Sequence, residues 1–273
     1  GAAGERIYQF AASAHRGPCN DDNRVYKQHI IFQTMSLFNR IFGGGDAPVY
    51  PTDELNINGK SLKISFYAHA SIAIEYEGRR IYVDPVMGNA EYDKLPKADV
   101  ILVTHSHYDH FDMAAIEHLQ QPETHILLDK SSAEGFEGDC YTMLPGAVAE
   151  PYADIRVEAV AAYNTSEHQL QFHPKEREDC GYVVTLGDAV RIYISGDTEP
   201  TTEQAALKDI DIAFVCVNQP YTMTPEQAVA AVKALQPKIY YPYHYGQVDE
   251  PTDVEALAKM LEGVTEVRIR PLA

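Results

Sequence analysis

The stretch that decides the fold is Thr104-His105-Ser106-His107-Tyr108-Asp109-His110-Phe111. It directly follows the apolar run Val100-Ile101-Leu102-Val103, which is typical of a strand buried on both faces. Three histidines and an aspartate in an irregular loop can point several donor atoms into one space. Imidazole nitrogen and carboxylate oxygen both suit zinc and neighbouring divalent ions. The motif therefore predicts a metal centre at the end of a buried strand.

Further candidate ligands stand at the ends of later predicted strands. The apolar run Ile192-Tyr193-Ile194 leads into Gly196-Asp197, where glycine lets the backbone approach a crowded centre and an aspartate could bridge two cations. His244 follows the apolar strand predicted over residues 239–243. Because one loop cannot orient enough donors for a metal, we expect Asp197 and His244 to add to the ligands of the histidine loop.

The rest of the chain predicts an α/β architecture. Apolar runs bounded by turn residues predict strands over residues 62–67, 72–76, 80–84, 100–104, 126–128, 155–161, 182–186, 190–194, 210–217, 239–243 and 267–269. Helices are predicted over residues 112–119 and 254–261 and from Thr224, where Thr224-Pro225-Glu226-Gln227 offers a cap, a first-turn proline and a capping box. Strands come first and then alternate with helices, which predicts a layered sandwich with the helices outside the sheets.

Two parts are predicted along the chain. Residues 61–273 form the catalytic domain, and residues 1–60 form an N-terminal extension with an amphipathic helix. The apolar stripe of that helix consists of Ile31, Met35, Phe38 and Phe42. The helix either packs on the main domain or serves as a lid, a dimer contact or a peripheral membrane contact. A homodimer is therefore one expected assembly.

The composition limits the partners. The 273 residues include 22 basic and 40 acidic side chains, and the formal charge of −18 disfavours a nucleic-acid partner. A bound cation reverses the local field, so phosphoesters stay open as substrates. The sequence shows no run of about 20 apolar residues for a transmembrane segment and no signal peptide. It begins at Gly1 without a methionine, and both a cytoplasmic and an exported location stay open.

The order HxHxDH, Gly-Asp and a late strand-end histidine resembles the metallo-β-lactamase superfamily from about Leu62 to the C-terminus. The segments Tyr67-Ala68-His69-Ala70-Ser71 and Asp84-Pro85 add to this resemblance. Together the motifs are similar to a branch of metal-dependent hydrolases related to lactonases and to phospholipase-D-like N-acylethanolamine-phospholipid hydrolases. The resemblance implies an α/β fold of the four-layer αββα type and an enzyme of the hydrolase class.

The resemblance also implies the roles of the site residues. The implied ligands are His105 and His107 for one metal, Asp109, His110 and His244 for the other, and Asp197 as the bridge. A metal-bound hydroxide is then the nucleophile, because coordination lowers the pKa of water to about 7. Asp109 steers this hydroxide or takes up its proton. One or two divalent ions are expected, zinc first, although manganese, iron and nickel accept the same ligands.

One position departs from the family pattern. The family supplies a further histidine after a strand that lies between the histidine loop and Gly-Asp, but here the strand of residues 157–163 ends in Asn164. Asparagine is a weak zinc ligand, so His168 or His173 is expected to fill the position. We favour His173, because Pro174 stiffens its segment.

The expected function is metal-dependent hydrolysis of an ester-type bond, a phosphodiester or a lactone, in a small-molecule substrate. A non-catalytic metal-binding protein is the alternative, which Asn164 keeps open, and a glyoxalase-like thioesterase is another. Di-iron redox relatives carry glutamate where His107 stands, which disfavours redox chemistry. The role of His69 stays open between orienting a ligand, contacting the substrate and supporting the structure.

Overall fold

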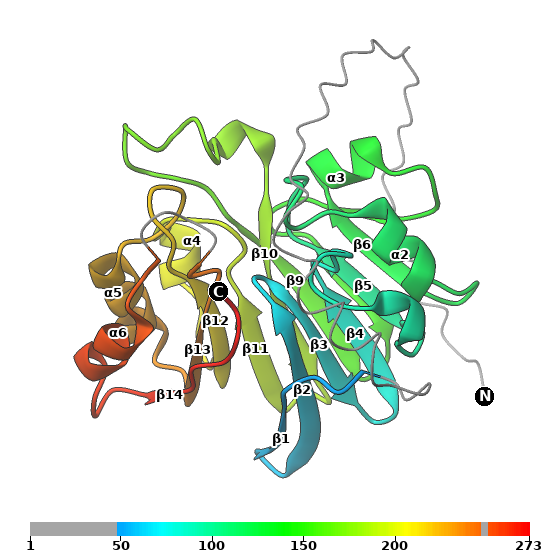
Figure 1. Ribbon diagram of the computed structural model, residues 1–273, viewed down its shortest axis with the longest axis horizontal. Helices are drawn as coiled ribbons and strands as arrows, with labels where there is room; N and C mark the ends of the chain where they lie inside the picture. The colour runs from blue at the N-terminus through cyan, green and yellow to red at the C-terminus, as the bar shows by residue number, and fades with distance from the viewer. Residues whose placement is uncertain (1–47, 247–250) are drawn as a thin grey trace, which may run out of the picture. The chain divides into compact units, whose positions relative to one another are not determined.

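Two seven-stranded sheets face each other in the computed structural model, which describes residues 48–246 and 251–273 (Figure 1). The first sheet contains β1 (Thr52–Ile57), β2 (Lys60–Ala68), β3 (Ser71–Tyr76), β4 (Arg79–Val83), β5 (Val100–Val103), β6 (His125–Asp129) and β7 (Tyr141–Met143). The second contains β8 (Val148–Tyr152), β9 (Ile155–Ala161), β10 (Cys180–Leu186), β11 (Val190–Ile194), β12 (Ile212–Cys216), β13 (Ile239–Tyr243) and β14 (Glu266–Val267). Each sheet keeps its strands in chain order.

The strand pairing changes from antiparallel to parallel in the same way along both sheets. The first four strands of each pair antiparallel, and from the fourth strand onward the pairs are parallel. Parallel neighbours bring their carboxyl ends to one edge of a sheet, which is where open α/β sheets bind ligands. The ends of β5, β11, β12 and β13 therefore define the edge that matters for function.

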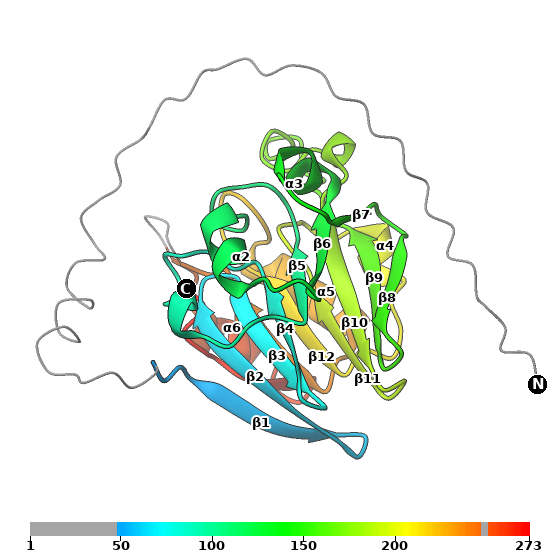
Figure 2. The same cartoon turned by 90° about the vertical axis from the view of Figure 1, so that its right-hand side faces the viewer.

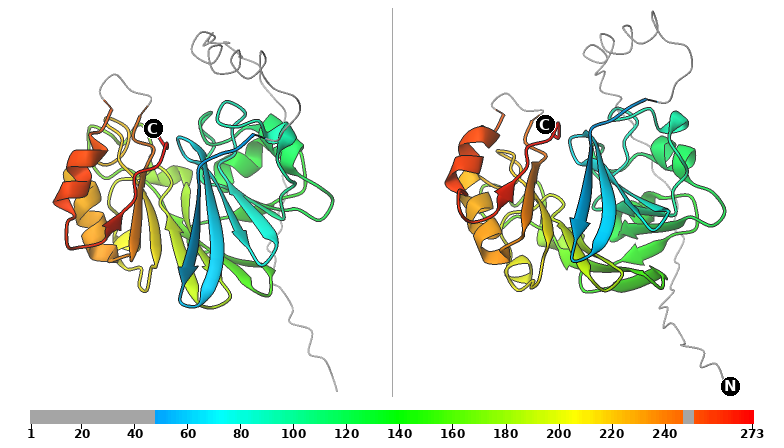
Figure 3. Two further views of the ribbon diagram at one scale, coloured as in Figure 1. Left: turned by 60° about the horizontal axis from the view of Figure 1, so that its bottom comes forward. Right: turned by 90° about the horizontal axis from the view of Figure 1, so that it is seen from below.

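Helices cover the outer face of each sheet. They are α2 (Met113–Leu119), α3 (Lys130–Gly135), α4 (Thr202–Ala205), α5 (Pro225–Leu235) and α6 (Val254–Met260), with short 3₁₀ turns η1 (Tyr92–Lys94) and η2 (Lys175–Arg177). Helix α2 lies over the first sheet (Figure 2), and α5 and α6 lie outside the second (Figure 3). The predicted αββα sandwich is confirmed by this layering.

The sheets are held together by apolar side chains from their inner faces. In β2, Leu62, Ile64 and Phe66 alternate with more exposed residues and are buried, as one face of a strand requires. The Phe66 ring lies 5.1 Å from the Tyr241 ring of the second sheet, and Tyr241 stacks on Phe214 at 4.9 Å. This aromatic contact joins the two sheets in the main core.

The predicted N-terminal extension lies largely outside the described residues, and so does its amphipathic helix. The described part of it contains β1, which pairs with β2 through a turn at Asn58-Gly59, so the first sheet begins before residue 61. Among the described residues, the helices are too short or too polar to span a membrane.

Candidate metal centre

Histidines and aspartates from both sheets meet at the carboxyl edge of the sandwich. The loop after β5 supplies His105, His107, Asp109 and His110, and the end of β11 leads to Asp197. The ends of β2 and β13 supply His69 and His244, and the connection between β9 and β10 supplies His173. The potential ligand atoms fall into groups whose members lie within 4.8 Å of one another.

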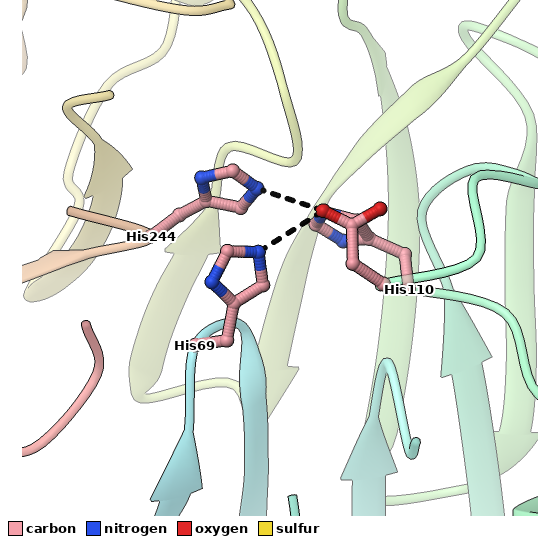
Figure 4. Close-up of side chains that lie close together, drawn as sticks. His69, His110 and His244 are labelled. Atoms are coloured by element: carbon pink, nitrogen blue, oxygen red, sulfur yellow. Dashed lines mark hydrogen bonds and ion pairs between the residues drawn. The ribbon is translucent and has the colours of Figure 1, made fainter. Parts of the chain in front are cut away.

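The first group is formed by His69, Asp109, His110 and His244 (Figure 4). Asp109 Oδ2 lies 3.1 Å from Nε2 of His69, 3.5 Å from Nε2 of His244 and 3.8 Å from Nε2 of His110. The rings of His69 and His244 are 3.8 Å apart between centroids. Four donors from three separate strand ends therefore converge on one volume.

The second group is formed by His105, His107 and His173. Nε2 of His105 lies 3.0 Å from Nδ1 of His107, and the His173 ring is 4.9 Å from the His107 ring. These are three imidazoles, a donor set that suits zinc.

Asp197 lies between the two groups. Its carboxylate oxygens are 3.2 Å from Nε2 of His244, 3.3 Å from Nε2 of His110 and 3.3 Å from Nε2 of His173. Nε2 of His105 is 3.8 Å away. One carboxylate thus reaches histidines of both groups.

Several of these strand ends adopt left-handed backbone conformations. His69, Asp84 and His244 have φ of 55°, 44° and 53°, values that are uncommon for residues other than glycine and that cluster at functional sites. Gly196, before Asp197, has φ of 62°, and a Cβ there would lie 2.9 Å from the carbonyl oxygen of Cys180. The backbone is therefore bent sharply where it presents the candidate ligands.

A chain of hydrogen bonds fixes the ring orientations of the second group. Arg177 Nη1 donates to Nε2 of His107 at 2.6 Å, and at the other end Thr104 Oγ1 donates to the Asp84 carboxylate at 2.7 Å. Because arginine only donates and a carboxylate only accepts, the direction is set throughout the chain. Nδ1 of His107 donates to Nε2 of His105, and Nδ1 of His105 donates to Thr104.

Two further polar residues orient histidines of the first group. Asp84 is fully buried and accepts a hydrogen bond from Nδ1 of His110 at 2.7 Å. Asn218, after β12, contacts Nδ1 of His244 at 3.1 Å and donates to the carbonyl of Gly246 at 3.0 Å. Such partners on the far ring nitrogen set which nitrogen faces a metal.

Most histidines of the second group are neutral at neutral pH. Burial and the nearby His110 hold the pKa of His105 well below its usual value. Burial, His173 and Arg177 lower the pKa of His107 to about 4. Neutral imidazoles offer the free lone pair that a metal needs.

The carboxylates produce the opposite effect at His110 and His244 of the first group. Burial alone would lower the pKa of His244, but the nearby carboxylates of Asp197 and Asp109 outweigh it and raise the value to about 9. The same balance between burial and carboxylates raises the pKa of His110. Burial would raise the pKa of Asp109, but the nearby rings of His110, His244 and His69 hold it below its usual range. Protons here balance a negative charge that a divalent cation would balance on binding.

One structural observation indicates that these residues are suited to hold a metal ion. Several buried polar atoms of the cluster have no hydrogen-bond partner: Nε2 of His110, His173 and His244, and Oδ1 of Asp197. Leaving buried polar atoms unpaired costs free energy, and in native structures such atoms call for an explanation such as an ion. Cations at the two groups would provide partners for these atoms.

All the residues favoured from the sequence as metal ligands lie in the cluster. His168, the alternative to His173, lies outside it. His168 is exposed, whereas His173 is buried. The Asn164 amide donates to the carbonyls of Gln169 and Tyr221 at 3.0 and 2.8 Å, so it holds two loops together.

Asp84, Asn218 and Arg177 have no role predicted from the sequence, and that of His69 stays open there. Asp84 and Asn218 each follow a buried strand, as Asp197 does, and this position is a signal that would have found them. Arg177 lies in η2, close to the cluster only through the fold, and no local sequence signal marks it.

The sandwich and its histidine–aspartate cluster define a metal-binding α/β protein. Residues 63–244 match the model of the beta-lactamase superfamily domain, and the chain belongs to this superfamily. A UPF0173 metal-dependent hydrolase of Koribacter versatilis is 30% identical over 227 residues, which cover 74% of this chain and 94% of that protein. The protein is a metal-dependent hydrolase of the metallo-β-lactamase superfamily.

Solved structures agree with this assignment. A protein from Parabacteroides distasonis, described as a metal-dependent hydrolase, has a TM-score of 0.77 and 40% identity, over 82% of this chain and all of that one. The metallo hydrolase Igni18 from Ignicoccus hospitalis has a TM-score of 0.65 over 77% of this chain and 95% of its own, and at 22% identity it supports the fold.

Proposed function

We propose that the protein hydrolyses an ester-type bond, in a phosphodiester or a lactone, with one or two divalent ions bound at the cluster. Zinc is the first candidate, and manganese, iron and nickel are the alternatives. The observation that carries the proposal is the position of Asp197, whose carboxylate lies within 4 Å of His105, His110, His173 and His244. A carboxylate shared by two groups of histidines is suited to a dinuclear centre.

The ligand assignment follows the two groups. Asp109, His110 and His244 would hold the first ion and His105, His107 and His173 the second, with Asp197 available to both. His69 donates its Nε2 hydrogen to Asp109 and thereby holds that carboxylate in place. A bound ion supplies a Lewis acid for the substrate oxygen and makes water acidic enough to attack at neutral pH.

Asp109 is the proposed catalytic residue. Its side chain is 20% exposed, compared with 4% for Asp197, so solvent and substrate reach it more readily. Its pKa lies below the usual range, so the carboxylate is ionised at neutral pH and can accept a hydrogen bond from the attacking water. Asp109 would orient this water and receive its proton during attack.

Apolar side chains beside the cluster favour a small organic substrate. Tyr108 is 80% exposed within the histidine loop, and the Phe172 ring meets the Tyr221 ring edge-on at 4.9 Å. Phe172 immediately precedes His173, and Leu170 is partly exposed in the same loop. These side chains offer contact area to an uncharged part of an ester.

Elemental analysis of the purified protein tests the metal centre. We expect close to two equivalents of metal in the parent protein and a lower content in His107→Ala and His173→Ala. His168→Ala is the matched control, because His168 is exposed in the same loop as His173. A His173→Ala protein with the metal content of the parent would remove His173 from the proposed ligands.

Hydrolysis of bis(4-nitrophenyl) phosphate and of simple lactones tests the reaction. We expect turnover of at least one class in the metal-loaded parent protein and its loss in Asp109→Asn, whose metal content is measured in parallel because Asp109 is also a proposed ligand. Full metal loading without turnover of either class would contradict the proposed substrates and favour the metal-binding alternative.

A further inference from the structure

Arg177 makes a contact that a metal ion at the second group would break. Its side chain is 26% exposed, its Nε pairs with the buried Asp179 at 3.2 Å, and its Nη1 lies 2.6 Å from Nε2 of His107. A second guanidinium nitrogen lies 3.4 Å from the Ser106 hydroxyl. The guanidinium thus spans from a buried carboxylate to a candidate metal ligand.

The hydrogen-bond roles make this contact and a bound metal mutually exclusive. Arginine has no acceptor, so Nε2 of His107 must be the acceptor, and a neutral ring then carries its one hydrogen on Nδ1. A cation bound at Nδ1 moves that hydrogen to Nε2, where it points at the Arg177 donor. A cation bound at Nε2 occupies the lone pair that Arg177 uses. In both cases Arg177 must withdraw from His107.

In the described part of the chain, no arginine or lysine contacts the histidines of the first group. Nδ1 of His110 and Nδ1 of His244 contact Asp84 and Asn218, while their Nε2 atoms face the carboxylates of Asp109 and Asp197 at 3.2 to 3.8 Å. The two groups therefore differ in local charge: two carboxylates favour a cation at the first group, whereas the Arg177 guanidinium disfavours one at the second.

We propose that Arg177 acts as a latch on the second group: it holds His107 in the metal-free protein and is displaced when the second ion binds. Loading is then sequential, with the Asp109–His110–His244 group filled first and at higher affinity. The inference rests on the proposed metal centre and not on the choice of substrate. Arg177 acts through His107 and is a positioning residue.

Zinc titration by calorimetry, with a competing chelator, tests the latch. We expect Arg177→Met to bind the second equivalent of zinc on the order of tenfold more tightly, because both the competing donor and a repelling charge are removed. Lys175→Met is the matched control, since Lys175 is an exposed cation of the same turn that pairs with Glu203. The control should bind zinc as the parent does.

Two additions keep the test decisive. If Arg177→Met alone folds poorly because Asp179 loses its partner, the double variant Arg177→Met/Asp179→Asn removes both charges and should show the same gain. In Arg177→Met/His173→Ala the gain should vanish, which locates it at the second group. Equal affinity for the second zinc in parent and Arg177 variants, or a zinc-loaded structure with Arg177 still hydrogen-bonded to His107, would overturn the proposal. Loss of hydrolytic activity alone would bear on the substrate and not on the latch.

Discussion

Asp84 illustrates how one buried carboxylate can support the candidate metal site without being one of its proposed ligands. It accepts hydrogen bonds from the Thr104 amide and hydroxyl as well as from Nδ1 of His110. In Asp84→Asn an amide NH₂ replaces one of these acceptors, so at least one donor is left facing a donor. We expect zinc affinity to fall by about 10- to 100-fold, as for other partners of metal-binding histidines. Zinc titration of purified protein measures this.

Asp93→Asn is the control for Asp84→Asn. Asp93 is exposed and lies in η1, in the connection between strands β4 and β5 of the same sheet. It should leave zinc affinity unchanged. Parent-like zinc affinity in Asp84→Asn would show that His110 keeps its orientation without this carboxylate.

Asp179 predicts a dependence of stability on pH. Burial raises its pKa from 3.8 to about 6, Arg177 offsets this only in part, and Asp129 adds to it. The folded state therefore binds the proton more tightly than the unfolded state. Its contribution to stability is complete below about pH 4 and is lost as the pH rises through 6. Asp179→Asn lacks this titration.

The measurable quantity is the difference in unfolding free energy between Asp179→Asn and the parent protein. It should rise by roughly 1 to 2 kcal/mol in favour of the variant between about pH 5 and pH 8. Urea denaturation at several pH values gives this difference. The titration of residues common to both proteins contributes equally to both unfolding free energies and cancels when they are subtracted. Asp139→Asn, at an exposed position, should show a constant difference. A constant difference for Asp179→Asn as well would contradict the prediction.

Residues of the cluster were predictable where a local pattern marks them. The histidine loop, Gly196-Asp197 and His244 each follow an apolar run, and the fold brings these strand ends together. The choice between His168 and His173 depends on the path of a loop, and Arg177 approaches His107 from 70 residues away along the chain. Contacts of that kind depend on tertiary structure and leave no local signal.

The loop between β9 and β10 depends on Glu199 for its position. The buried Glu199 carboxylate accepts hydrogen bonds from the amides of Thr165 and Ser166 and from the Gln227 side chain at the start of α5. This loop carries His173. We expect Glu199→Ala to lower the unfolding free energy by about 2 to 4 kcal/mol, because several buried donors lose a charged acceptor, and to reduce zinc binding at the second group.

Denaturant unfolding and zinc content measure the two effects of Glu199→Ala. Glu167→Ala is the comparison, since Glu167 is exposed in the same loop. If Glu199→Ala lost stability but kept two equivalents of zinc, the loop would hold His173 in place without this carboxylate.

Elements with strong patterns were predictable, and short or exposed ones were not. The capping box at Thr224 and the strands β2 to β5 have clear signals, and the structure contains them. The strands β7 and β8 were not predicted, because they are edge strands with weak apolar alternation, and Pro151 lies within β8. Strand β1 was not predicted either, although Asn58-Gly59 is the turn sequence most typical of a hairpin.

At the scale of the whole molecule, the cluster joins the two sheets. His69 and His110 come from the first sheet, and Asp197 and His244 from the second. A cation held by both binds the folded state and not the unfolded chain, so it stabilises folding by about 2.7 kcal/mol at 100 times its dissociation constant. For a protein of this size that corresponds to a rise in Tm of roughly 5 to 10 °C.

Thermal unfolding before and after chelation measures this stabilisation. We expect the parent protein to lose it with chelator and to regain it with zinc. His244→Ala should show a smaller rise in unfolding temperature with zinc, because the first group loses one of its two proposed ligands from the second sheet. His118→Ala, an exposed position on α2, should respond as the parent does. A zinc response in His244→Ala as large as that of the parent would mean that His244 does not help to hold the ion and does not link the second sheet to the first through it.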